Sequence, residues 1–278
     1  MKRRQVLVQG AASATLTVLA GGATAAETGT KPMAIQEQVV EITTPEGKCT
    51  TFVAHPAGGG SHPAVLIFMD AAGYRKELCD MARRLAGAGY FALLPNLYYR
   101  SGVLDLGPAD VNQQSEWFKR TMTYGAVLNV PKLMSDTDAI LAWLDTQKAA
   151  KKGPMGVMGF CMSGAFVLNA AARHPERFAA AATIYGTSLV TDKPDSPHKL
   201  VPGIKGALYF AYGEKDPFIP HDQVEGIRAS LAGKTNAEVE VYPGLQHGFA
   251  FPERYAYDKA GTDHLFAQLE ALYGKTLG

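Results

Sequence analysis

The stretch Gly159-Phe160-Cys161-Met162-Ser163-Gly164 decides the fold. It follows an apolar run, Met155 to Met158, and opens into a helix-like run, Ala165 to Ala172. A strand that passes through a turn of small residues into a helix lifts the side chain at the turn above the edge of a parallel sheet. Glycine at 159 and small residues at 163 and 164 fit so tight a turn. The stretch therefore predicts that Cys161 is an exposed nucleophile.

Two further residues complete the pattern. Asp216 lies in Gly213-Glu214-Lys215-Asp216-Pro217, and His247 lies in Gly244-Leu245-Gln246-His247-Gly248-Phe249. Taken singly, each of the three residues has a plain structural explanation, as a packed cysteine, a turn aspartate or a loop-capping histidine. In this order, and each just after a predicted strand, they match the nucleophile, acid, histidine order of α/β-hydrolases. We therefore predict a Cys161-Asp216-His247 triad.

The predicted chemistry is acyl transfer to sulfur. His247 takes the proton of Cys161, and Asp216 holds the imidazole and fixes its tautomer. The amino end of the following helix favours the thiolate. Backbone N–H groups of Met162 and Ala71, which follow the nucleophile and the first central strand, form the predicted oxyanion hole. No pair of histidines has the spacing of a zinc site, so neither a metal nor another cofactor is expected.

Strand-like and helix-like segments alternate along the chain, which predicts one α/β-hydrolase domain over residues 38–278. Its sheet is expected to be mostly parallel, with helices on both faces. The predicted strands are 39–42, 49–54, 64–69, 90–94, 155–158, 180–184, 207–212 and 238–242; the predicted helices are 75–88, 134–143, 165–172, 222–231 and 262–272. The stretch 98–130 has no clear period and predicts an irregular, lid-like segment over the carboxyl ends of the strands.

The amino terminus predicts export. Residues 1–25 combine a basic start, an uncharged stretch and a small-residue cleavage site before Ala26, which is the pattern of a signal peptide. The paired arginines Arg3 and Arg4 favour the twin-arginine route into the periplasm, although an ordinary secretory signal with chance arginines stays open. Residues 26–37 are then expected to be a flexible tether.

Composition limits the function classes. The 278 residues carry a formal net charge of +1 and are 47% hydrophobic, so neither nucleic acid nor an anionic membrane surface is an expected partner. After the signal, no apolar run approaches the roughly 20 residues of a membrane span. Cys49 and Cys79 lack metal or redox spacing and are predicted to be packed core residues. Their pairing and the oligomeric state stay open.

Four blocks of the sequence resemble the dienelactone hydrolase family. They are 69–73 (Met-Asp-Ala-Ala-Gly), 94–100 (Leu-Pro-Asn-Leu-Tyr-Tyr-Arg), the Cys161 turn, and 247–252 (His-Gly-Phe-Ala-Phe-Pro). The resemblance covers nearly all of the chain after the signal. It implies a compact α/β-hydrolase fold with a Cys161-Asp216-His247 triad, and it implies opening of an unsaturated lactone that carries a carboxylate, through a thioester on the cysteine.

The resemblance also suggests substrate-site residues. Asp70 stands where those enzymes have a glutamate that helps to activate the thiol, and Arg100 matches the first of two arginines that bind the substrate carboxylate. The second arginine position falls on Phe251, which cannot bind an anion, and Arg254 is a candidate replacement. This departure weakens the expectation of a dienelactone as substrate and leaves the hydrolysis of an ester or lactone.

We therefore predict an exported cysteine hydrolase that acts on a small-molecule ester or lactone. One alternative is a non-catalytic protein that binds small ligands on an α/β-hydrolase scaffold. A second alternative is a thiol redox protein in which Cys161 is oxidised, although no resolving cysteine lies near it in the sequence.

Overall fold

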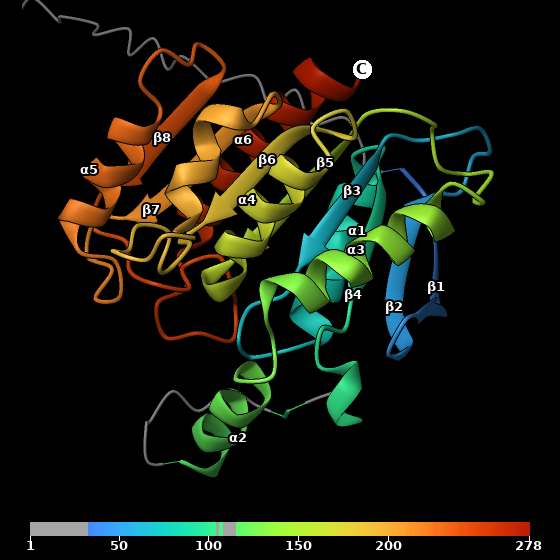
Figure 1. The fold of residues 1–278 in the computed structure, drawn as a ribbon. Coiled ribbons are helices and arrows are strands. Elements are labelled where there is room, and N and C mark those ends of the chain that lie inside the picture. The colour runs from blue at the N-terminus through green and yellow to red at the C-terminus, as the bar shows by residue number, and fades with distance from the viewer. Residues whose placement is uncertain (1–32, 104–105, 108–114) are drawn as a thin grey trace, which may run out of the picture. The chain divides into compact units, whose positions relative to one another are not determined.

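The computed structural model describes residues 33–103, 106–107 and 115–278, and its described strands form one sheet (Figure 1). The strand order is β1-β2-β4-β3-β5-β6-β7-β8. Strands β1 and β2 form an antiparallel hairpin, β2 also pairs with β4 in antiparallel fashion, and the remaining pairs are parallel. The predicted α/β class and the predicted hairpin are confirmed. The strands are β1 (Ile35–Thr44), β2 (Gly47–Pro56), β3 (Ala64–Phe68), β4 (Phe91–Pro95), β5 (Met155–Phe160), β6 (Phe178–Ile184), β7 (Ala207–Gly213) and β8 (Ala237–Tyr242).

Helices cover both faces of the sheet (Figure 1). On one face lie α1 and α6, which are joined by an Arg84–Asp263 ion pair of 3.0 Å. On the other face lie α3 and α4, which are joined by Arg173 and Asp138 at 2.6 Å. The helices are α1 (Lys76–Gly87), α2 (Glu116–Gly125), α3 (Val130–Leu144), α4 (Gly164–Arg173), α5 (His221–Ser230) and α6 (Lys259–Leu277), with short 3₁₀ turns η1 (Tyr99–Ser101), η2 (Cys161–Ser163) and η3 (Pro197–Gly203).

The core lies between the sheet and these helices. Every residue of β3, β4 and β5 is buried, because helices pack on both sides of these strands. This explains why their sequences are continuous apolar runs instead of alternating ones. Helix α1 buries one stripe, made of Leu78, Cys79, Met81, Ala82, Leu85 and Ala86.

Some predicted boundaries are wrong. Strand β1 begins at Ile35, so the last three residues of the predicted tether 26–37 belong to a strand. Helix α3 begins at Val130 and not at 134, because the Asn129 side chain accepts the Lys132 N–H at 3.0 Å and caps the helix there. The predicted signal peptide 1–25 and the tether as far as residue 32 lie outside the described residues.

The stretch 98–130 is more regular than predicted. It contains η1 and the helix α2, which Ser115 caps by accepting the Phe118 N–H at 3.0 Å. The sequence signal for α2 is the helical spacing of Trp117, Phe118, Thr121 and Tyr124, all buried or half-buried, which the prediction of an irregular segment overlooked. Residues 104–105 and 108–114 of the predicted lid-like segment lie outside the described residues, and its role as a lid stays a prediction.

The two cysteines outside the site are buried and free, as expected for packed core residues. Burial raises the pKa of Cys49 to about 12, so this thiol is not a nucleophile at neutral pH. None of the helices in the described ranges is both long and apolar enough to cross a bilayer.

Candidate active site

Cys161 occupies a strained turn between β5 and α4. Its φ of 55° lies in the left-handed region that residues with a side chain rarely adopt. Glycine makes this turn possible on both sides. A Cβ at Gly159 would lie 2.8 Å from a Val167 methyl carbon, and a Cβ at Gly164 would lie 2.8 Å from the Cα of Gly186. The close backbone packing therefore fixes the position of Cys161 at the carboxyl end of β5.

We expect Gly159→Ala to lower the free energy of unfolding by about 1–3 kcal/mol, because the added methyl group has no room against Val167 and the Ser163 carbonyl. Urea denaturation measures this loss. Gly58→Ala is the matched control, since a Cβ at Gly58 meets no atom within 4 Å. Equal denaturation midpoints for the two variants would contradict the packing argument.

His247 and Asp216 are paired. The Nδ1 atom of His247 lies 2.7 Å from Oδ2 of Asp216, whose side chain has no exposed surface. The other Asp216 oxygen accepts the Phe218 N–H at 2.8 Å, which holds the carboxylate in place. Burial disfavours the charged imidazole, but hydrogen bonds to Asp216 and Cys161 outweigh it and raise the pKa of His247 to about 9. The structure thus brings the three predicted triad residues together.

The turn after β3 faces this group of residues. The Asp70 carboxylate accepts the Ala72 N–H at 3.2 Å, and the Asp70 carbonyl accepts the Gly73 N–H at 3.0 Å. Tyr98 donates its hydroxyl to the Ala71 carbonyl at 2.9 Å. These bonds fix the peptides around Ala71, which is one of the two predicted oxyanion donors.

Ser163 has a structural role. Its side chain is fully buried and its hydroxyl donates to the Met69 carbonyl, which ties the end of β3 to the turn at Cys161. Met162, the other predicted oxyanion donor, lies between Cys161 and this anchored serine within η2.

Asp70 is buried in an ion cluster. Arg75 contacts both of its carboxylate oxygens, at 2.6 and 3.2 Å, and Nη2 of Arg254 contacts Oδ2 at 3.2 Å. Arg75 also donates to Glu253 at 2.7 Å. Burial raises the pKa of Asp70, but the two guanidinium groups outweigh burial and hold it below its usual value. Asp70 is therefore an ionised partner of two arginines, and Arg254 points toward the site.

Two other predicted substrate contacts lie elsewhere. Arg100 donates to both oxygens of Asp136, at 2.7 and 2.9 Å, and to Glu46, so its guanidinium is already occupied. The prediction that it binds substrate finds no support in this geometry. Phe251 is fully buried and packs on Phe160, and the Arg75 guanidinium lies 4.3 Å above its ring. Phe251 is a core residue under the ion cluster.

Sequence reasoning missed three aromatic residues near the site. The ring of Tyr185 lies 4.8 Å from the His247 ring, and the ring of Phe218, 60% exposed, lies 5.0 Å from it. Trp117 of α2 lies 5.9 Å from the Arg254 guanidinium carbon. Tyr185 and Phe218 follow the carboxyl ends of β6 and β7, and that position is the signal that could have identified them.

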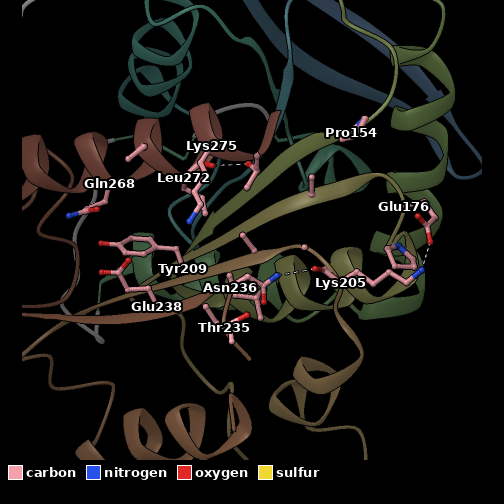
Figure 2. Close-up of a pocket in the computed structure, with 18 residues that line it drawn as sticks. Pro154, Glu176, Lys205, Tyr209, Thr235, Asn236, Glu238, Gln268, Leu272 and Lys275 are labelled. Carbon is pink, nitrogen blue, oxygen red and sulfur yellow. Dashed lines mark hydrogen bonds and ion pairs between the residues drawn. The ribbon is translucent and has the colours of Figure 1, made fainter. Parts of the chain in front are cut away.

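One cavity lies at the opposite edge of the sheet. It has a volume of about 620 Å³ and lies near the amino ends of β6, β7 and β8. Figure 2 shows Tyr209, Asn236 and Lys205 among its lining residues, with Lys205 paired to Glu176. It contains no triad residue and no strained backbone, so we do not assign the chemistry to it. Across the described part of the chain, no group of three or more potential metal ligands is present.

Comparisons with known proteins agree with this geometry. Residues 49–275 match the model of the dienelactone hydrolase family. A Salmonella typhimurium protein named for carboxymethylenebutenolidase activity is 30% identical over 82% of this chain and 83% of its own. A protein of the same name from Methylorubrum extorquens is 32% identical over 78% of this chain and 74% of its own length. The crystal structure of a protein assigned as a dienelactone hydrolase from Klebsiella pneumoniae is 25% identical and superposes with a TM-score of 0.76 over 87% of this chain and 99% of its own. The chain therefore belongs to the dienelactone hydrolase family and is a hydrolase of that type.

Proposed function

We propose that this hydrolase cleaves a small carboxylic ester or lactone through a thioester on Cys161. The observation that carries the proposal is the arrangement around His247, whose Nδ1 lies 2.7 Å from Oδ2 of Asp216 and whose pKa is raised by both Asp216 and Cys161. This arrangement is what a base needs in order to activate a nucleophile. The relatives named for carboxymethylenebutenolidase activity support the same reaction class.

In the first step the Cys161 sulfur attacks the carbonyl carbon, and the carbonyl electrons move onto oxygen. The N–H groups of Ala71 and Met162 then stabilise the oxyanion. When the intermediate collapses, the bond from carbon to the leaving oxygen breaks, and the protonated His247 gives its proton to that oxygen. A thioester and an alcohol result; for a lactone the alcohol stays attached to the acyl group.

In the second step water attacks the thioester, and neutral His247 takes a proton from this water. The carbon–sulfur bond breaks, the carboxylic acid leaves, and the thiolate and imidazolium are restored. Asp216 stays ionised throughout and stabilises the imidazolium. Asp70, whose oxygens are held by Arg75 and Arg254, would act on the thiol only after leaving one of these partners.

We expect the enzyme to hydrolyse phenyl acetate at neutral pH and to lose activity above about pH 9. The reason is the raised pKa of His247, because the imidazolium that protonates the leaving group exists below this pKa and disappears above it. Asp216→Asn removes the carboxylate that raises the pKa, so the alkaline limb should move to lower pH and the rate should fall by up to about 10⁴-fold. Initial rates from pH 6 to 10 measure both effects.

Absence of turnover of phenyl acetate and of a dienelactone by the wild type would reject the proposal. The same alkaline limb in wild type and Asp216→Asn would show that His247 is not the titrating group. Comparison of the two substrates measures how far the paired Arg100 and the phenylalanine at 251 disfavour a carboxylated lactone.

We also propose that the protein is exported to the periplasm. The basic start with paired arginines and the small-residue cleavage pattern before Ala26 support this proposal. The hydrolase would then meet its substrate outside the cytoplasm.

A further inference from the structure

The Tyr185 hydroxyl is a buried polar group that has no hydrogen-bond partner in the part of the chain that the structure describes. Tyr185 follows β6, is 1% exposed and has a φ of 39°, an unusual value for a residue with a side chain. Within the described ranges its hydroxyl oxygen has no hydrogen-bond partner. A buried polar atom without a partner costs about 1–3 kcal/mol, and where such an atom lies beside the reacting groups a bound substrate can supply the partner.

This hydroxyl belongs to the reaction centre. The Tyr185 ring packs against His247 at 4.8 Å, and it packs at 6.5 Å on Phe251, which lies under the Arg75 guanidinium. Burial, and then the negative charges of Asp70 and Cys161, raise the pKa of Tyr185 far above its usual value. The hydroxyl is therefore protonated and available as a donor.

Two more buried donors have no hydrogen-bond partner among the described residues, namely Nε1 of Trp117 and Nε of Arg254, which lies 3.9 Å from a Glu253 carboxylate oxygen. The Arg254 guanidinium carbon lies 5.9 Å from the Trp117 ring. All three groups can donate a hydrogen bond. A ligand that satisfies them must bring acceptor atoms, and oxygen is the ordinary acceptor in an ester.

The scissile ester group does not supply these acceptors. Its carbonyl oxygen has two lone pairs, which the Ala71 and Met162 N–H groups occupy in the proposed mechanism. Its leaving oxygen takes a proton from His247. The remaining donors therefore require a further oxygen elsewhere in the acyl group.

The charges around these donors indicate that the further oxygen is neutral. The two guanidiniums of Arg75 and Arg254 face three carboxylates, those of Asp70, Glu77 and Glu253. No excess positive charge is left in this cluster to pair with a substrate anion. Arg100, the other candidate for binding an anion, is neutralised by Asp136 and Glu46.

Building on the proposed thioester mechanism, we propose that Tyr185 is a further catalytic residue, which donates a hydrogen bond to a second oxygen of the acyl group. The substrates are then neutral esters or lactones whose acyl part carries an ether, hydroxyl or keto oxygen. Nε of Arg254 contributes to the same recognition.

Two isosteric substrates test this proposal. Phenyl methoxyacetate and phenyl butanoate have the same number of non-hydrogen atoms and differ by an oxygen in place of a methylene. Tyr185→Phe should lower kcat/KM for the methoxyacetate by about 5- to 100-fold and for the butanoate by less than about 3-fold. The ratio between wild type and variant cancels the different intrinsic reactivity of the two esters.

Tyr273→Phe is the matched control. Its hydroxyl is also buried without a hydrogen-bond partner among the described residues, but Tyr273 lies on α6, so loss of its hydroxyl should leave both rates unchanged. Neither variant should lower the melting temperature, because neither loses a hydrogen bond within the protein. Monophenyl succinate, which is anionic, should react more slowly than phenyl butanoate with the wild type.

Each result that contradicts these expectations rejects a different claim. Equal losses on both neutral esters, or no loss on either, would overturn the role of Tyr185 while leaving the hydrolase mechanism intact. A preference for monophenyl succinate would overturn the neutral substrate class. Failure of the wild type to hydrolyse any of the esters would reject the proposed function itself.

Discussion

Cys161→Ala is expected to lower ester hydrolysis by at least about 10³-fold. The sulfur is the only protein atom that bonds covalently to the acyl group in the proposed mechanism, and the rest of the site retains only its oxyanion and binding contributions. In the wild type, acid quenching during turnover of phenyl acetate should trap an acetyl group on Cys161. Mass spectrometry of the peptide that contains residues 159–164 detects this adduct.

Cys79→Ala is the matched control for this substitution. Cys79 is also a free thiol, but it is buried in α1 against the core, and burial raises its pKa. Its removal should leave the rate per folded molecule unchanged. Ester turnover that survives Cys161→Ala would reject the nucleophile, and consumption of peroxide without ester turnover would favour the redox alternative.

The sequence was sufficient to predict the sheet and the residues of the candidate triad because local patterns determine both. Continuous apolar runs predicted the strands β3, β4 and β5, and the turn of small residues predicted the position of Cys161. The positions of Asp216 and His247 followed from the rule that functional residues lie at the carboxyl ends of parallel strands.

The ion cluster could not be predicted in the same way. Arg75 and Arg254 are 179 positions apart in the numbering, and each lies in a polar-looking stretch typical of a surface. Arg75 follows Asp70 closely in the sequence, but only the fold brings Arg254 to the same buried carboxylate. Likewise, nothing local to Arg100 shows that Asp136 of α3 will occupy its guanidinium. The partner of a charged residue can be identified only when the long-range packing is known.

Asp70→Ala is expected to lower the free energy of unfolding by about 3–5 kcal/mol. The substitution leaves Arg75, which is 6% exposed, without its closest carboxylate and with Glu253 as its remaining close partner, and a buried charge that has lost part of its counter-charge is more costly than the intact cluster. Asp70 also fixes the turn after β3 through the Ala72 N–H, so hydrolysis should fall together with stability. Urea denaturation at constant m-value measures the change.

Two measurements distinguish loss of the ion pair from loss of packing as the cause of this destabilisation, namely its dependence on pH and the stability of a double variant. Since folding lowers the pKa of Asp70, its ionised form contributes stability above the unfolded value of about 3.9, and this contribution is lost as the pH falls through the folded value. The deficit of Asp70→Ala should therefore shrink on acidification. Removing both partners, in Asp70→Leu with Arg75→Met, should recover much of the lost stability, because no buried guanidinium that has lost its closest carboxylate then remains at position 75. A deficit that is independent of pH and additive in the double variant would mean that Asp70 acts through packing alone.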